Sequence, residues 1–325
     1  MKFALLRVLP VAVAGLMLAA PAAAVDAELL GMVMPEARFV GGINVMEAKA
    51  SPFGRFVLNK LQAEEEELQR FVLKTGLDPR QDIREMLMAS TGEKAQTLLL
   101  AAGNFAAARL LSAAQSEGLT VTKYKDADII VLAKPGRANA ERAPWVALLN
   151  GNVAVIGEQS LVKAAVDRRG SISLKASLAQ NARNWSTQYH AWMTTDQPAA
   201  KLAAAPAPAP GAPNNNPIRP EYLQAIDEAS GGIRFGSSTV DIASEALART
   251  DRDAQALVDV ARFLASLAQG RQQQMPSAAA ALLQSMNVNQ QGRTVRLTAT
   301  MPEADLEKLL DTPRHRPAAK TAARH

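Results

Sequence analysis

Residues 145–170 read WVALLNGNVAVIGEQSLVKAAVDRRG, and this stretch decides the fold class. Two short apolar runs, WVALLN and NVAVIG, meet at Asn150-Gly151, which is the strongest two-residue signal for a β-hairpin. The run SLVKAAVDRR follows at once with helical spacing of its apolar residues. Because a two-residue turn joins only antiparallel neighbours, the stretch predicts antiparallel strands followed by a helix.

Gly157, which ends the second run, raises the alternative of a phosphate-binding turn. A dinucleotide fingerprint requires three spaced glycines, and a P-loop requires Gly-Lys-Ser/Thr after its glycine. Here Glu158, Gln159 and Ser160 follow instead. Glu158 would place a negative charge where the phosphate binds, and it suits a helix N-terminus as a capping group with Ser160. The sequence therefore predicts a strand that turns into a helix, and no nucleotide cofactor.

Strand-like and helix-like runs form two similar series along the chain. Each series is predicted to run strand, helix, two strands, helix, further strands and a closing helix. The match is one of pattern and not of residue identity, and it predicts a duplication with a first α+β unit at 25–187 and a second at 188–313. The expected fold is α+β, with two tandem units of mainly antiparallel β-sheet and helices packed on one face. The closing helices share apolar residues at i, i+3 and i+4, namely Leu161, Ala164 and Ala165 in one and Leu306, Leu309 and Leu310 in the other.

A Pro-rich stretch, PAAKLAAAPAPAPGAPNNNPIRP, occupies residues 198–220. Its composition alone favours an interdomain linker. The repeat instead places it inside the second unit, between a strand in YHAWMTT (189–195) and a helix predicted for PEYLQAIDEA (220–229). We therefore expect a disordered, protease-sensitive surface insertion at 198–220.

The N-terminus has the three parts of a secretory signal peptide. Lys2 and Arg7 form its basic start, VLPVAVAGLMLAA its apolar run, and Ala22-Ala23-Ala24 its cleavage pattern. An uncleaved anchor is the alternative, but a spanning helix requires about 20 apolar residues and Pro10 interrupts this run early. We expect removal of residues 1–24 by cleavage after Ala24, and a mature protein that is soluble in the periplasm of a bacterium or secreted.

The chain contains no cysteine. This excludes disulfides, a lipid-modified cysteine, thiolate metal sites and cysteine nucleophiles. An exported chain without disulfides depends on its core for stability, and a mature length of about 300 residues is enough to form one.

The basic charge lies at the two ends of the chain. The sequence has 36 Lys and Arg against 31 Asp and Glu, and the signal peptide and the tail at 314–325 carry the excess. The nearly neutral body argues against a nucleic-acid partner. The tail is expected to be disordered, either as an inert solubilising end or in weak peripheral contact with an anionic membrane surface. Its cationic residues are Arg314, Arg316, Lys320 and Arg324.

Residues for catalysis are scarce. Histidine occurs only at 190, 315 and 325, and neither G-x-S-x-G nor H-E-x-x-H is present. The run Glu64–Glu67 points in four directions on a helix, so it does not converge on one cation. We therefore predict no catalytic residue, no metal site and no cofactor. Catalysis by a pair of carboxylates, as in glycosidases, stays an open alternative, because Asp and Glu are plentiful.

Trp185, Tyr189 and Trp192, in NWSTQYHAW, form the single aromatic cluster of the sequence. They are a candidate platform for a sugar or another ligand. Packing in the core is the alternative, because large aromatic side chains mostly fill cores.

Four segments together resemble a family of exported bacterial proteins with no assigned activity. They are ARFVGGINVMEAKASPFGRFVL (37–58), GLDPRQDI (76–83), NGNVAVIGEQSLVKAAVDRR (150–169) and GGIRFG (231–236). The resemblance covers nearly the whole mature chain and implies an envelope location and an α+β build, but no site residue. We expect a non-enzymatic envelope protein that binds a partner protein, a lipid or a small apolar ligand. The alternative is a carboxylate-dependent envelope hydrolase acting on saccharide or peptidoglycan.

Overall fold

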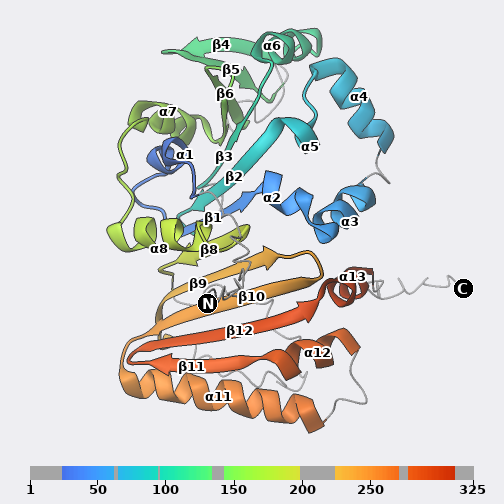
Figure 1. The fold of residues 1–325 in the computed structure, drawn as a ribbon. Coiled ribbons are helices and arrows are strands. Elements are labelled where there is room, and N and C mark those ends of the chain that lie inside the picture. The colour runs from blue at the N-terminus through green and yellow to red at the C-terminus, as the bar shows by residue number, and fades with distance from the viewer. Residues whose placement is uncertain are drawn as a thin grey trace, which may run out of the picture.

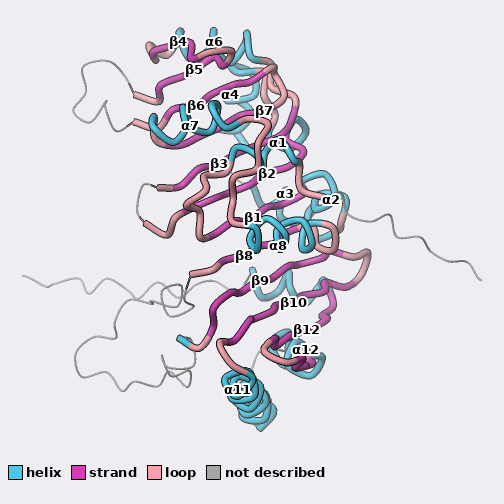
Figure 2. Tube along the Cα trace, turned by 90° about the vertical axis from the view of Figure 1, so that its left-hand side faces the viewer, coloured by secondary structure: helices cyan, strands magenta, loops and turns pink. Residues whose placement is uncertain are grey.

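All the described strands lie in one sheet of twelve, and every neighbouring pair is antiparallel. The computed structural model describes residues 24–61, 65–93, 96–133, 143–197, 224–270 and 277–311. The strands are β1 (Phe39–Asn44), β2 (Ile83–Ser90), β3 (Thr97–Gly103), β4 (Thr120–Tyr124), β5 (Ala127–Val131), β6 (Trp145–Leu149), β7 (Val153–Gly157), β8 (Ala191–Thr195), β9 (Ile226–Phe235), β10 (Thr239–Ala248), β11 (Asn287–Gln291) and β12 (Thr294–Pro302). Their order across the sheet is β11-β12-β10-β9-β8-β1-β2-β3-β7-β6-β5-β4 (Figures 1 and 2). The α+β class with an antiparallel sheet is therefore confirmed.

Helices cover both faces of this sheet. The described helices are α1 (Ala27–Met32), α2 (Val45–Ala50), α3 (Pro52–Leu61), α4 (Glu65–Thr75), α5 (Pro79–Asp82), α6 (Ala107–Ser116), α7 (Gln159–Arg168), α8 (Ala176–Ser186), α11 (Asp251–Gly270), α12 (Ser277–Ser285) and α13 (Glu303–Asp311). We call the side with α1, α7 and α8 the α8 face, and the side with α2, α4, α6 and α11 the α6 face (Figure 1). The expectation that helices pack on one face is thus wrong for β1 to β7, where the apolar residues of both faces require cover.

The largest part of the core lies on the α8 face. Alternate residues of β2 and β3 point there, and Leu87 pairs directly with Leu100. Both are about 1% exposed and pack in one cluster with fully buried Leu29 and Leu30 of α1 and Leu178 of α8. Burying each such side chain contributes about 1.5–3 kcal/mol, so α1 is held in place by its own leucines.

The hairpin predicted at Asn150-Gly151 is confirmed. Both residues have positive φ, 48° and 69°, as a type I′ turn requires. β6 pairs antiparallel with β7, and α7 starts directly after it. Glu158 is the N-cap residue of α7, but its side chain makes no capping hydrogen bond, so its expected capping role is wrong.

The structure departs from the sequence expectations in the second series. Residues 226–229, expected at the end of a helix, begin β9, which is paired on both sides by β8 and β10. Tertiary pairing here overrides a weak local preference for helix. β8 also joins β9 to β1, so the sheet runs without interruption through both predicted units. The tandem repeat itself stays a prediction.

Three predicted segments lie outside the described residues: the signal peptide up to residue 23, the Pro-rich insertion at 198–220 and the tail at 314–325. Among the helices that the structure describes, none combines the length and the apolar character needed to cross a membrane.

Candidate functional site: an apolar cavity under α4 and α6

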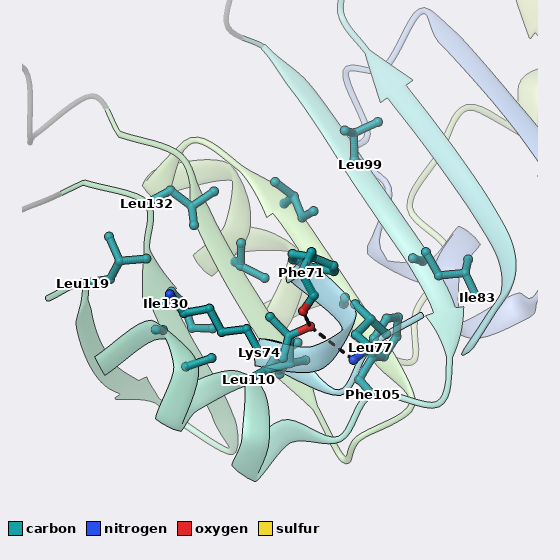
Figure 3. A pocket seen from close by; sticks show the side chains of 18 of the residues that line it. Phe71, Lys74, Leu77, Ile83, Leu99, Phe105, Leu110, Leu119, Ile130 and Leu132 are labelled. Carbon is teal, nitrogen blue, oxygen red and sulfur yellow. Dashed lines mark hydrogen bonds between the residues drawn. The ribbon is translucent and has the colours of Figure 1, made fainter. Parts of the chain in front are cut away.

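A cavity of about 520 Å³ lies on the α6 face of the sheet (Figure 3). Strands β3, β7, β6 and β5 form its floor, and helices α4 and α6 form its roof. Its lining is apolar except for Lys74, Thr75 and Glu117. Both its size and its composition are typical of small-molecule sites, which measure about 300–1,000 Å³.

Small side chains on floor and roof produce the hollow. Ala101 of β3 pairs directly with Ala154 of β7, and together they form the middle of the floor. Ala113 and Ala114 face them from α6. Longer side chains around these alanines, such as Leu110, keep helix and sheet apart, so the methyl groups leave space between them.

The entrance of the cavity is also apolar. Phe71, Met86, Leu99 and Leu132 line it and are each between 38% and 45% exposed. They come from α4, β2, β3 and the end of β5, so the patch arises from the fold and not from one sequence segment. Exposed apolar side chains that adjoin a cavity indicate an interaction site more strongly than isolated ones.

The polar side chains of the lining are already paired. Lys74 of α4 forms an ion pair with Glu117, which directly follows α6. The Thr75 hydroxyl donates to the Phe71 carbonyl oxygen at 2.7 Å and accepts from the Leu77 amide at 3.2 Å. The cavity thus offers an apolar interior with two opposite charges at its edge, which suits an apolar chain better than a polar substrate.

A glycine determines where α4 ends and in which direction the chain continues from the cavity. Gly76, directly after α4, has φ of +71°, and a Cβ there would lie 2.6 Å from the Arg109 guanidinium carbon. The positive φ turns the chain sharply, and the missing side chain lets α4 end against α6. A glycine directly after a helix is a common stop signal, because it adopts the left-handed conformation without strain.

The three aromatic residues of the candidate ligand platform lie elsewhere, between α8 and the sheet. Trp185, Tyr189 and Trp192 are 6%, 9% and 6% exposed. The rings of Trp185 and Tyr189 stack with centroids 4.9 Å apart, and Arg296 lies 5.9 Å from the Trp185 ring. A ligand platform requires an exposed ring face, and here the faces are used for packing. Their position is that of core residues.

The other residues considered from the sequence are not part of the cavity. Arg314, Arg316, Lys320 and Arg324 lie outside the described residues. The imidazole of His190, half-buried near Glu47, accepts a hydrogen bond from the Phe235 amide at 3.2 Å through Nδ1. Desolvation by burial holds its pKa below the ordinary value.

A second, smaller cavity of about 340 Å³ lies between α11 and strands β9, β10 and β12. Leu257 and Ala261 of α11 and Leu297 of β12 line it, together with Glu245 and two serines. It provides an internal comparison for the larger cavity.

Sequence reasoning missed the residues of the large cavity. The alanines of QTLLLAAGN and FAAARLLSAAQSEG were visible, but alanine is common in helices and carries no mark of a binding site. The informative fact is that the two segments face each other, which follows only from the sheet order.

Comparison with known proteins shows the fold. No family model and no curated protein sequence matches the chain. The solved structure of crystal form I of TP0453 is similar over 89% of this chain and 98% of its own, with a TM-score of 0.51 and 10% identity. Crystal forms III and IV of TP0453 match with TM-scores of 0.51 and 0.50, at 10% and 9% identity. The chain therefore has a fold similar to that of TP0453, across nearly the full length of both proteins.

Proposed function

We propose that this protein is an exported, non-enzymatic bacterial envelope protein that binds the acyl chain of a lipid-like amphiphile in the cavity under α4 and α6. The observation that carries the proposal is the cavity of about 520 Å³ whose lining is apolar apart from three residues. The secretory pattern of residues 1–24 supports the location, since an envelope protein works beside membranes and their lipids.

The apolar lining provides enough binding energy for such a ligand. Each methylene group buried from water contributes about 0.8 kcal/mol. About ten buried methylenes contribute about 8 kcal/mol to binding, before the cost of ordering the ligand is subtracted. A binding free energy of that size corresponds to a dissociation constant of about 1 μM, so we expect a chain of that length to bind no more tightly than this. Longer chains bind more tightly until the cavity is full.

The entrance determines which amphiphile fits. Lys74 and Glu117 place both charges at the junction of α4 and α6. A headgroup there stays in contact with water, while Phe71 and Leu132 cover the first part of the chain. We therefore expect single-chain amphiphiles, such as a fatty acid or a lysophospholipid, to bind with the headgroup at the entrance.

A carboxylate-dependent hydrolase acting on saccharide or peptidoglycan is the alternative function. Burial raises the pKa of Glu85 to about 7, and Asp26 lies beside it. A raised carboxyl pKa next to a second carboxylate is a pattern found in catalytic pairs. Glu85 does not line the cavity, however, and its side chain packs beside α1 on the α8 face. Binding is the function that the cavity supports better.

Titration with a long-chain fluorescent fatty acid tests the proposal. We expect saturable binding by the native protein, and competition by unlabelled fatty acid and by lysophospholipid in separate arms. Ala101→Phe fills the floor of the cavity and is expected to weaken binding at least tenfold. Absence of saturable binding, or equal binding by A101F with an unchanged circular dichroism spectrum, would contradict the proposal. Turnover of a saccharide that Glu85→Gln abolishes would favour the hydrolase.

A matched pair of phenylalanines tests the entrance. Phe71 of α4 lines the cavity and is 42% exposed, whereas Phe263 of α11 is 57% exposed and does not line it. Phe71→Ala removes apolar contact with the ligand and is expected to weaken binding about fivefold to thirtyfold. Phe263→Ala removes the same side chain from a surface remote from the ligand, so its dissociation constant should stay within about twofold of the native value.

A further inference from the structure

The first residues of the expected mature chain are anchored in the protein interior. Val25 is 6% exposed, and its backbone nitrogen donates to the Ser186 hydroxyl at 2.9 Å. Ser186 is 4% exposed and donates its own proton to the Arg183 carbonyl oxygen at 3.0 Å. The hydroxyl oxygen is thus oriented as an acceptor toward Val25. Helix α1 follows directly and buries its leucines in the main core.

Two carboxylates lie near this nitrogen. The Asp26 amide donates to Glu85 Oε2 at 3.1 Å, and the Asp26 carboxylate accepts from the Glu28 amide at 2.8 Å. Successive backbone nitrogens are at most about 4 Å apart, so the Val25 nitrogen lies within about 7 Å of the Glu85 carboxylate. Within the described chain, no ion pair joins Asp26 or Glu85 to a Lys, Arg or His side chain.

We infer that Ser186, Asp26 and Glu85 form a binding site for the chain's own α-ammonium group, which is created when the leader is cleaved after Ala24. Hydrolysis of the Ala24–Val25 peptide bond consumes one water molecule and leaves a carboxylate on Ala24 and an amine on Val25. The amine takes up a proton and becomes an ammonium group with three donors. One donor keeps the bond to Ser186, and the positive charge lies within about 7 Å of the Glu85 carboxylate.

The charge balance of this site changes on cleavage. Before cleavage the Val25 nitrogen is a neutral amide, and the partly buried Glu85 carboxylate has Asp26 as a like-charged neighbour. Desolvation and then the Asp26 charge raise the pKa of Glu85 to about 7, while the Asp26 amide and Arg84 act in the opposite direction. After cleavage an ammonium group lies near both carboxylates. Cleavage is therefore expected to stabilise the folded protein. Ala24 is exposed, so the peptide bond that is cleaved lies at the border of the surface.

This inference rests on the export that the proposed function includes, so its test must separate docking from cleavage. Two chains are compared, one that begins at Val25 and one that keeps Ala22-Ala23-Ala24 before it. Each is released from a fusion partner by a protease that leaves no residue behind. Each is prepared with Glu85 and with Glu85→Gln, and thermal unfolding midpoints are measured at pH 7.5.

We expect the effect of E85Q to change sign between the two chains. It lowers the midpoint of the chain that begins at Val25, because the ammonium group loses its partner. It raises the midpoint of the extended chain or leaves it unchanged, because a buried carboxylate is removed. Glu28→Gln is the control: Glu28 pairs with Arg169, so its loss should affect both chains equally. Equal shifts by E85Q in both chains would overturn the inference.

Reactivity of the α-amine provides a second readout that does not depend on stability. Acylation at neutral pH, followed by mass spectrometry, is expected to be at least tenfold slower at Val25 than at Ala22 of the extended chain, and E85Q should accelerate it. Equal rates would overturn the inference. N-terminal sequencing of the exported protein is expected to give Val25 as the first residue. Another first residue would mean that the exported protein has no α-ammonium group at this site, and would overturn the inference. Fatty-acid binding is measured independently, and we expect E85Q to leave it unchanged.

Discussion

At the scale of single residues, two glycines allow aromatic rings to lie flat on the sheet. A Cβ at Gly42 of β1 would lie 2.8 Å from the Trp192 ring, and one at Gly232 of β9 would lie 2.4 Å from the Tyr189 ring. Real Cβ atoms do not approach so closely, and both rings are buried under α8. The glycine pairs in VGGINV and SGGIRF thus position α8, a role that the sequence shows only once the rings are placed over them.

Gly232→Ala is predicted to destabilise the protein by about 2–3 kcal/mol, because the added methyl group displaces the Tyr189 ring from a packed core. The neighbouring glycine provides the control. A Cβ at Gly231 would meet the Ala243 carbonyl oxygen at 3.4 Å, an ordinary contact, so Gly231→Ala should change stability by less than about 0.5 kcal/mol. Urea unfolding of the two variants measures the difference, and equal losses would argue against the packing role.

His190 makes the stability depend on pH. Burial, and more weakly Arg234, lower the pKa of His190, whereas Glu47 raises it. Protonation in the folded state also ends the hydrogen bond that Nδ1 accepts from the Phe235 amide. Because the folded pKa lies below the unfolded value of about 6.5, the unfolded chain binds the proton more readily, and stability falls as the pH drops through that value.

His190→Gln is predicted to flatten this dependence, because glutamine is polar but does not titrate. Free energies of unfolding at pH 7.5 and pH 5.5 are compared in the native protein and the variant. We expect the native protein to lose more stability on acidification than H190Q does. An identical loss would assign the pH dependence to other groups.

At the scale of elements, the cavity depends on how α4 and α6 are joined above the sheet. The Lys74–Glu117 ion pair connects the two helices, and its side chains are 43% and 48% exposed. An exposed pair contributes at most about 1 kcal/mol to stability, so its removal should leave the fold intact. Its position at the edge of the cavity gives it more influence on ligand exchange than on folding.

Lys74→Gln is predicted to accelerate dissociation of the fluorescent fatty acid several-fold, because α4 then separates from α6 more easily. Lys123→Gln breaks another exposed ion pair, with Asp128 on β5, away from the cavity lining. It should leave the dissociation rate unchanged. Stopped-flow displacement measures both rates, and equal rates in the two variants would exclude a role for the pair in exchange.

Local signals in the sequence predicted the elements that are formed locally. The Asn150-Gly151 turn and helix α7 are examples, since turn chemistry and helical spacing act over a few residues. The helix expected up to residue 229 was wrong because β9 is stabilised by its neighbours β8 and β10. The cavity was not predictable, since it requires Ala101 to pair with Ala154, more than fifty residues away, beneath two alanines of α6.

At the scale of the whole molecule, one sheet carries two cavities on its α6 face. The larger lies under α4 and α6, and the smaller lies under α11 near the other end of the strand order. Strand β1 lies between β8, which contributes Met193 to the smaller cavity, and β2, which contributes Ile83 and Met86 to the larger, and the two cavities share no lining residue. The smaller cavity has a volume of about 340 Å³ against about 520 Å³ for the larger, which makes it the less favourable place for a long acyl chain.

Photo-crosslinking with a fatty acid that carries a diazirine near the end of its chain tests the location of the ligand most directly. The acyl chain is expected to label β3, α6 and β7, so modified peptides should map to residues 97–119 and 145–157, and Ala101→Phe should abolish the labelling. Labelling that maps instead to α11 and β12, or that persists unchanged in A101F, would contradict binding in the cavity under α4 and α6.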